Sequence, residues 1–337
     1  MRILVGLIAL LIAVVSLEGG VRLFGIDQRL LRRGLFHQQA DLPVHQCSND
    51  PQLHYELRPG AQFTGTGPGG QPYNVSIDES GARRPAHPRQ KGPGVFRILC
   101  LGGSTMYGAG VEDGETIPAR LEARLNALSP ASSSVRYEAW NFGTSAYVLR
   151  QVAQLARQQM TSLQPDLILI QMHNVGRRPF LASDECSGVD PTQDADAGRR
   201  FFLEQFPAPR WIGEELHLKL AMGLAVYRSF LPLTVGVADG SPCAYCDALD
   251  VAAAEQLLQE AAEHGVPVRF IALPADRGQW PRMTLPERAA SMTIDLYRPD
   301  REPDFYEVHP PAPILDEYAG GILEALRGEN LLGEIGG

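Results

Sequence analysis

Short apolar runs alternate with amphipathic segments between about residues 96 and 327, which is the pattern of an α/β domain. The run 165–172 is very apolar, as expected of a strand buried on both faces of a parallel sheet. The segments between runs place apolar residues three or four positions apart, as in helices that cover a sheet. The pattern predicts a doubly wound, mainly parallel sheet in a three-layer α/β/α arrangement. The predicted strands are 98–101, 135–141, 165–172 and 266–273, and the predicted helices are 116–128, 150–163, 252–264 and 313–326.

A different hydrophobic segment opens the chain. Residues 3–17 form a continuous run of apolar and small residues behind Arg2, followed by Glu18. This run is short for a membrane-spanning helix, which needs about 20 residues, but continuation past Glu18 supplies the length. We expect 1–25 to be an uncleaved transmembrane anchor, with a cleaved signal peptide as the alternative. We also expect the rest of the chain to be exported to the periplasmic or extracellular side, although arginines flank the run on both sides and leave its orientation ambiguous.

Proline and glycine punctuate the chain between this segment and the α/β pattern. Short polar and β-prone pieces such as 74–77 lie among them. We therefore predict a linker and small β extension over 26–95 and the α/β domain over 96–330, interrupted by an insertion at about 176–245. A helix is expected at 216–231 within this insertion. The insertion's aromatic residues fit either a cap that binds an acyl chain or sugar rings, or a small core of its own.

The net charge and the cysteines limit which partners the protein is expected to bind and in which cellular compartment it is expected to lie. The formal net charge of −9 disfavours nucleic acid, because phosphate binding needs a basic face. Cys100 falls in a predicted strand and is expected to be a buried small hydrophobe. The other cysteines lie in polar or Gly/Pro-rich stretches, where an oxidising compartment permits two disulfides. The pair Cys243 and Cys246 also fits a redox or metal pair, but nothing nearby completes a zinc site, so we expect no metal and no cofactor. These four cysteines are Cys47, Cys186, Cys243 and Cys246.

Residues suited to acyl transfer follow three predicted strands and precede the last predicted helix. Ser104 comes after strand 98–101 and two glycines, which lack a Cβ and so let a substrate approach the backbone. Gly143 and Asn174 follow the next two strands, and His309 lies before the final helix. Parallel strands end at one sheet edge, where α/β folds bind ligands, so we expect these residues to meet there. Alone, each also fits an ordinary turn or a phosphate-binding turn.

In this order, these residues resemble the four sequence blocks of the SGNH or GDSL hydrolase superfamily. The resemblance covers about 96–327 and implies a flavodoxin-like α/β/α fold. Two earlier segments, 57–60 and 80–83, resemble the stretch that precedes the domain in the membrane-anchored bacterial branch. The four blocks are 102–105, 141–143, 173–174 and 308–310.

The resemblance implies a role for each block. Ser104 is the expected nucleophile, and His309 the expected general base and then acid. The expected oxyanion hole consists of the backbone N–H groups of Ser104 and Gly143 and the side-chain amide of Asn174. Each such donor is typically worth about 3 kcal/mol of transition-state stabilisation.

The last block departs from the superfamily, because Tyr306 stands where an Asp usually orients the histidine. Asp304 is our candidate for that role, with Glu307 as the alternative; a Ser–His dyad that uses a backbone carbonyl is the third reading. An unoriented imidazole loses tautomer control and stabilisation of its charged form. Two functions therefore stay open. One is an esterase that removes O-acyl groups such as acetyl from a cell-envelope glycan or glycolipid, with lipase or thioesterase activity also open; the other is a catalytically weakened carbohydrate-binding or polymer-assembly protein.

Overall fold

The structure is a computed structural model, and every structural statement below concerns the residues that it describes. These are 2–26, 44–50, 52–53, 55–67, 70–129, 135–145, 147–171, 244–273, 289, 291–296 and 309–332. Asn174, Asp304, Glu307, Cys186, Cys243 and the helix expected at 216–231 lie outside these ranges.

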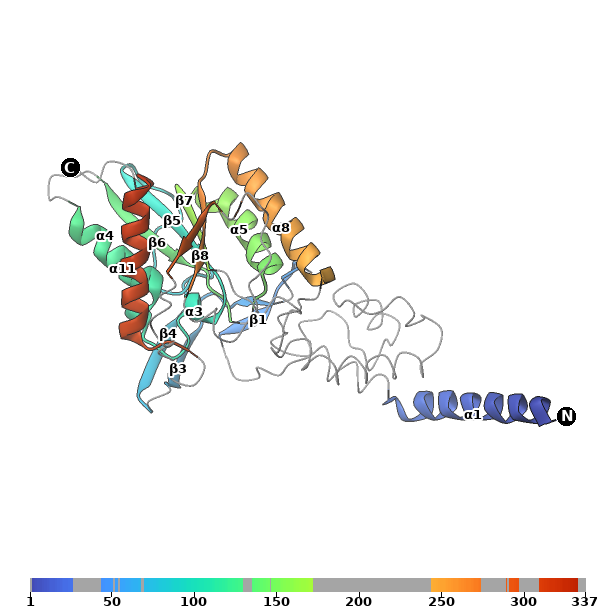
Figure 1. Cartoon of the computed structure of the whole chain (residues 1–337). Helices are drawn as coiled ribbons and strands as arrows, with labels where there is room; N and C mark the ends of the chain where they lie inside the picture. Colours follow the sequence, from blue (N-terminus) through green and yellow to red (C-terminus); the bar gives the residue numbers. More distant parts are fainter. Residues whose placement is uncertain are drawn as a thin grey trace.

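A five-stranded sheet in the order β6-β5-β7-β8-β9 forms the centre of the fold, and all its strand pairs are parallel (Figure 1). Apart from Arg97 and Gln171, the strands β5 and β7 are apolar on both faces, as the sequence pattern predicts. The predicted fold class, a doubly wound parallel sheet with covering helices, is confirmed. The strands are β5 (Val95–Leu101), β6 (Arg136–Asn141), β7 (Leu167–Gln171), β8 (Val268–Ala272) and β9 (Thr293–Asp295).

Two pairs of helices cover the two faces of this sheet. The alternation along β5 decides which residues face which pair: Leu99 and Leu101 pack with α5 and α8, whereas Ile98 and Cys100 pack with α4 and α11. Cys100 is fully buried, as predicted, and burial raises the pKa of its thiol. The four helices are α4 (Ile117–Leu128), α5 (Leu149–Leu163), α8 (Ala244–Glu263) and α11 (Ala312–Gly328).

The extension before the sheet consists of two antiparallel hairpins. It shares a core with the α/β domain, because Leu53, Tyr55 and Ala82 belong to the same buried cluster as Trp140 and the inner face of α5. The described residues between 44 and 91 are therefore packed against the domain and do not form a separate linker before it. The strands are β1 (His45–Cys47), β2 (Tyr55–Leu57), β3 (Gln62–Thr66) and β4 (Pro72–Ser76).

Four elements differ from the sequence-based expectation. A short helix, α3 (Ser104–Tyr107), begins at Ser104 itself and is followed by a 3-10 turn, η1 (Asp113–Glu115). The sequence instead predicts that the helix after Ser104 begins only near residue 115. Helix α8 begins at Ala244 rather than at residue 252, and β9 was not predicted. A single helical turn and a three-residue strand are too short to show a periodic pattern.

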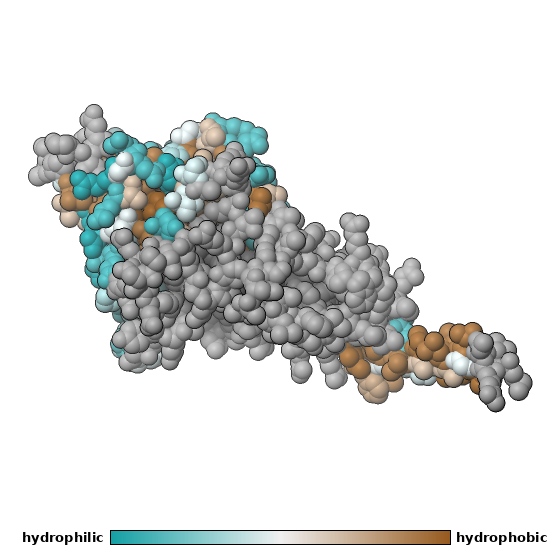
Figure 2. Space-filling view, in the orientation of Figure 1, coloured by the Kyte–Doolittle hydropathy of each residue, from teal (hydrophilic) through white to brown (hydrophobic). Residues whose placement is uncertain are grey.

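The chain begins with α1 (Arg2–Phe24), an apolar helix that is exposed along most of its length (Figure 2). The stretch Val5–Phe24 is long and apolar enough to cross a membrane, and only 6% of it is buried. A signal sequence has the same properties, so both readings of this segment stand.

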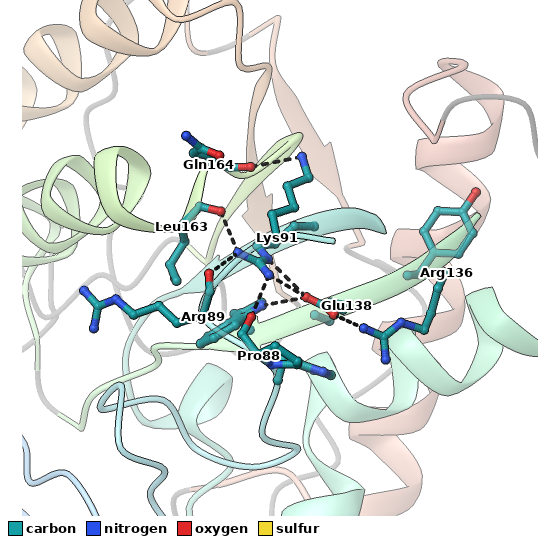
Figure 3. A network of polar contacts seen from close by, with 12 residues as sticks. Pro88, Arg89, Lys91, Arg136, Glu138, Leu163 and Gln164 are labelled. Carbon is teal, nitrogen blue, oxygen red and sulfur yellow. Dashed lines mark hydrogen bonds and ion pairs between the residues drawn. The ribbon is translucent and has the colours of Figure 1, made fainter. Parts of the chain in front are cut away.

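A buried ion pair joins β5 and β6 near their amino ends (Figure 3). Arg97 and Glu138 are register partners, and Arg97 Nη2 lies 2.9 Å from Glu138 Oε2, with both side chains 1% exposed. The guanidinium also donates to three backbone carbonyls and lies 5.0 Å from the centroid of the Trp140 ring. Each charge is thus compensated where water is excluded. The three carbonyls belong to Pro88, Arg89 and Leu163.

Candidate active site

Ser104 is the first residue of α3, directly beyond the carboxyl end of the interior strand β5, and it is half-buried. The carbonyl of Ser104 accepts hydrogen bonds from the N–H groups of Gly108 and Ala109, both at 2.9 Å. Gly108 then ends the helix in the left-handed conformation, at φ 86°. Because this conformation costs little for glycine, the chain can reverse immediately after one turn.

The amino end of α3 is capped by a side chain from a neighbouring strand. The N-cap residue, Gly103, has no side chain to offer, and instead Oε1 of buried Gln171 accepts the Met106 N–H at 3.1 Å. A Cβ at Gly102 would lie 2.7 Å from Gln171 atoms and 2.9 Å from Met106 Cβ. Gly102 is thus required for packing against Gln171, a reason additional to the expected approach of a substrate. The role of Gln171 was not predicted, because a polar residue at a strand end resembles any surface residue.

The carboxyl end of α3 is held by Arg83 from the extension. Its Nη1 donates to the carbonyls of Tyr107 and Gly108, at 2.8 and 2.6 Å. The side chain of Arg83 is completely buried. Both ends of a helix too short to be stable alone are thereby fixed by other parts of the chain.

Gly143 lies against α3, where the backbones approach closely. A Cβ at this position would lie 2.2 Å from the Tyr107 backbone nitrogen and 2.6 Å from the Met106 carbonyl carbon. The Gly143 N–H donates to Oδ1 of Asn141 at 3.0 Å, and Nδ2 of Asn141 lies 3.4 Å from the Tyr107 carbonyl oxygen. The N–H predicted to serve the oxyanion hole is therefore engaged by a side chain here. An oxyanion would have to share or displace that bond, and the role of Gly143 as a donor stays a prediction.

Gly143→Ala is expected to lower the free energy of unfolding by about 1–3 kcal/mol or more, because its methyl group would overlap backbone atoms that have no room to move. Thermal and urea denaturation measure this loss. Gly320→Ala in α11 is the matched control, because a Cβ at this position would have its nearest neighbouring atom 3.8 Å away. Alanine inside a helix is also more stable than glycine by about 0.5–1 kcal/mol. Equal stability of the two variants would contradict the close packing of Gly143.

His309 lies just before Pro311, the N-cap residue of α11, and is half-buried. Helices that connect parallel strands run back across the sheet, so they begin at its carboxyl edge. Helix α11 contacts η1, and its starting end lies on the same side of the sheet as α3 (Figure 1). Ser104 and His309 thus share that edge. The roles of His309, Asn174, Asp304 and Glu307 stay predictions.

The loop after Gly143 is also fixed by the extension. The Tyr55 hydroxyl donates to the Ser145 carbonyl at 2.7 Å, and the Tyr147 hydroxyl donates to the Tyr55 carbonyl. The Gln151 side chain then donates to the Leu53 carbonyl at 2.7 Å. Burial raises the pKa of Tyr147 well above its ordinary value, so the hydroxyl remains a donor. No sequence pattern predicted these contacts.

Among the residues described, no cluster of three or more His, Cys, Asp or Glu side chains could hold a metal ion. The expectation that the protein uses no metal therefore rests on the sequence.

No protein-family profile and no curated protein sequence matches the chain. Solved structures do resemble it. Psychrotrophic esterase EstA from Pseudoalteromonas sp. is 10% identical with a TM-score of 0.38, over 69% of this chain and 98% of that one. A carbohydrate esterase family 2 enzyme from Corynascus thermopiles (Myceliophthora fergusii) is 14% identical with a TM-score of 0.38, over 74% and 69%. A lipolytic protein of the G-D-S-L family from Desulfitobacterium hafniense is 9% identical with a TM-score of 0.26, over 68% and 99%.

Proposed function

We propose that this chain is a serine ester hydrolase of the SGNH/GDSL type that acts through an acyl-enzyme on Ser104. The observation that carries the proposal is the position of Ser104, at the start of a one-turn helix directly beyond β5. Buried Arg83 and Gln171 hold the two ends of this helix. A nucleophile that is already held in one geometry does not have to be ordered during the reaction, which lowers the entropic part of the activation barrier.

In the proposed mechanism, His309 accepts the proton of Ser104 Oγ as this oxygen attacks the acyl carbonyl. The tetrahedral intermediate then collapses, and the alcohol leaves with the proton from His309. Water hydrolyses the acyl-enzyme through the same two steps and regenerates the serine. The backbone N–H of Ser104 and the Asn174 amide are the proposed oxyanion donors, together with Gly143 if its N–H turns from Asn141 to the oxyanion. Asp304, or else Glu307, is proposed to orient His309.

The proposed substrate is an O-acyl group, such as acetyl, on a cell-envelope glycan or glycolipid, with the domain anchored at the membrane and exported. The support for this finer proposal is the exposed apolar helix α1, which would keep the domain near an envelope substrate. Fold alone does not define the substrate of such an enzyme. Comparison of acetate release from an acetylated polysaccharide with hydrolysis of a long-chain ester distinguishes a glycan deacetylase from a lipase.

Covalent labelling tests the proposed nucleophile directly. The full-length chain in detergent is expected to react with a fluorophosphonate probe, and peptide mass spectrometry is expected to find the adduct on Ser104. A serine whose oxygen is not activated does not react with this probe at a comparable rate. Absence of both labelling and p-nitrophenyl acetate hydrolysis would contradict the proposed function. That result would favour the catalytically weakened carbohydrate-binding protein, to which Tyr306 in place of the usual Asp already points.

A further inference from the structure

Arg83 makes every hydrogen bond that a guanidinium can donate. Besides the carbonyls of Tyr107 and Gly108, its Nη2 donates to the carbonyl of Val111 at 2.6 Å and to that of Asn74 at 3.2 Å. Its Nε donates to Oδ1 of Asp113 at 2.8 Å. All five N–H bonds of the side chain therefore have partners, although the residue is 0% exposed. A buried charge satisfied in this way fixes the position of each group that it contacts.

These partners come from separate parts of the chain. Asn74 lies in β4, Tyr107 ends α3, and Asp113 begins η1. The Arg83 guanidinium also lies 4.9 Å from the centroid of the Tyr107 ring. The backbone N–H of Arg83 donates to the carbonyl of Asn141 at 2.9 Å. The side chain of Asn141 in turn accepts the N–H of Gly143. One residue thus links the extension, the helix that carries Ser104, and the end of β6.

The turn after α3 is built closely around this guanidinium. A Cβ at Gly108 would lie 3.1 Å from Arg83 Nη1 and 2.5 Å from Thr116 Cγ2. Gly108 is also left-handed, so the turn needs glycine for both reasons. A lysine at position 83 could reach one or two of these carbonyls but has no planar fork to bind all of them.

We propose that Arg83 is a positioning residue for the nucleophile: it fixes the carboxyl end of α3 and thereby the direction of the Ser104 side chain at the other end of the same turn. This assignment rests on the proposed function of Ser104. It makes the β extension part of the active site's construction, since a displacement of about 1 Å at a reacting group can reduce the rate by about 100-fold. Arg83 touches no reacting atom in this scheme, and it acts only through α3.

The test compares Arg83→Lys and Asp113→Ala with Arg84→Lys in the full-length chain in detergent. Arg83→Lys keeps the charge but loses the fork, and we expect kcat for p-nitrophenyl acetate to fall by about 10–100-fold with KM changed less than about threefold. Asp113→Ala removes the Nε partner of Arg83, a carboxylate that is 20% exposed, but leaves the four carbonyls in place, so an intermediate loss of kcat is expected. Arg84 is the adjacent, exposed arginine, and its variant is expected to match the wild type.

Hydrogen–deuterium exchange supplies a measurement that does not depend on catalysis. Arg83→Lys is expected to speed exchange in peptides covering 104–109, because the N–H groups of Tyr107, Gly108 and Ala109 close this turn, while α4 keeps its protection. Wild-type kcat in both Arg83→Lys and Asp113→Ala, even with a lower melting temperature, would overturn the positioning role and leave a purely structural one. Absence of turnover in the wild type itself would overturn the proposed function instead, and unchanged exchange in 104–109 would then overturn the assignment of Arg83 as well.

Discussion

Ser104→Ala is expected to reduce kcat for p-nitrophenyl acetate by about 10³-fold or more and to abolish labelling by the fluorophosphonate probe. The substitution removes only the attacking oxygen and leaves binding and any oxyanion donors in place, so the residual rate reflects those alone. Steady-state kinetics on the full-length chain in detergent measure the loss. Ser162→Ala in α5 is the matched control, because Ser162 is also half-buried and its hydroxyl bonds only to Gln159 of the same helix.

The partnership with His309 adds a sharper form of this experiment. Residues that act as one unit in catalysis lose activity non-additively. His309→Ala is therefore expected to cost about as much as Ser104→Ala, and the double variant no more than either single one. Losses that multiply would show that His309 is not the base for Ser104. Full activity in Ser104→Ala would contradict the nucleophile assignment altogether.

The second large effect is expected at the buried ion pair. Arg97→Met should lower the free energy of unfolding by about 3–5 kcal/mol, because it leaves the Glu138 carboxylate buried without its main partner. The same change leaves the three backbone carbonyls that Arg97 binds without their donor. Urea denaturation followed by circular dichroism measures the difference.

Two further variants show how much of this loss of stability comes from the buried ion pair. In Arg97→Met/Glu138→Leu, the buried carboxylate, which Arg136 alone would still pair in Arg97→Met, is gone as well. Part of the stability should therefore return, but the carbonyls left without a donor prevent full recovery. Arg124→Ala, which breaks the pair with Asp316 at 2.7 Å, serves as the control, because those side chains are 41% and 39% exposed. Such a surface pair is worth about 0–1 kcal/mol. A loss in Arg97→Met as small as that in Arg124→Ala would mean that the ion pair does not contribute as its burial indicates.

The hydrophobic pattern is sufficient to predict four of the five strands of the sheet and the four helices that cover it. Runs such as 165–172 have the length and apolar content of strands buried on both faces of a sheet. The amphipathic segments between these runs indicate helices that cover the two faces. The same pattern could not predict α3, since one turn of helix is stabilised by Gln171 and Arg83 rather than by its own sequence. The sequence therefore places Ser104 correctly beyond the end of β5, but it does not place this residue on a helix.

Residue type was a poor guide where a polar side chain is buried. Arginine is almost always exposed unless it is paired, so nothing in the sequence marks Arg83 as a completely buried residue beside the nucleophile turn. Its segment 80–83 was noted only as a resemblance. Gly143 was correctly singled out, but the sequence suggested an oxyanion donor, whereas the structure places its N–H on Asn141 and its Cα against α3. Backbone contacts of this kind depend on tertiary packing, which a linear pattern does not contain.

The contacts between the extension and the active-site loops span long stretches of chain, and this affects how the protein folds. Tyr55 and Ser145 are 90 positions apart, and Leu53 and Gln151 are 98 positions apart. Contacts between residues so distant in sequence form slowly, because a long loop must close first. The extension precedes these loops in the chain, so its contacts with them cannot form until the loops have been synthesised. We expect the surroundings of Ser104 to be completed late in folding, after β6 and α5 have joined the sheet.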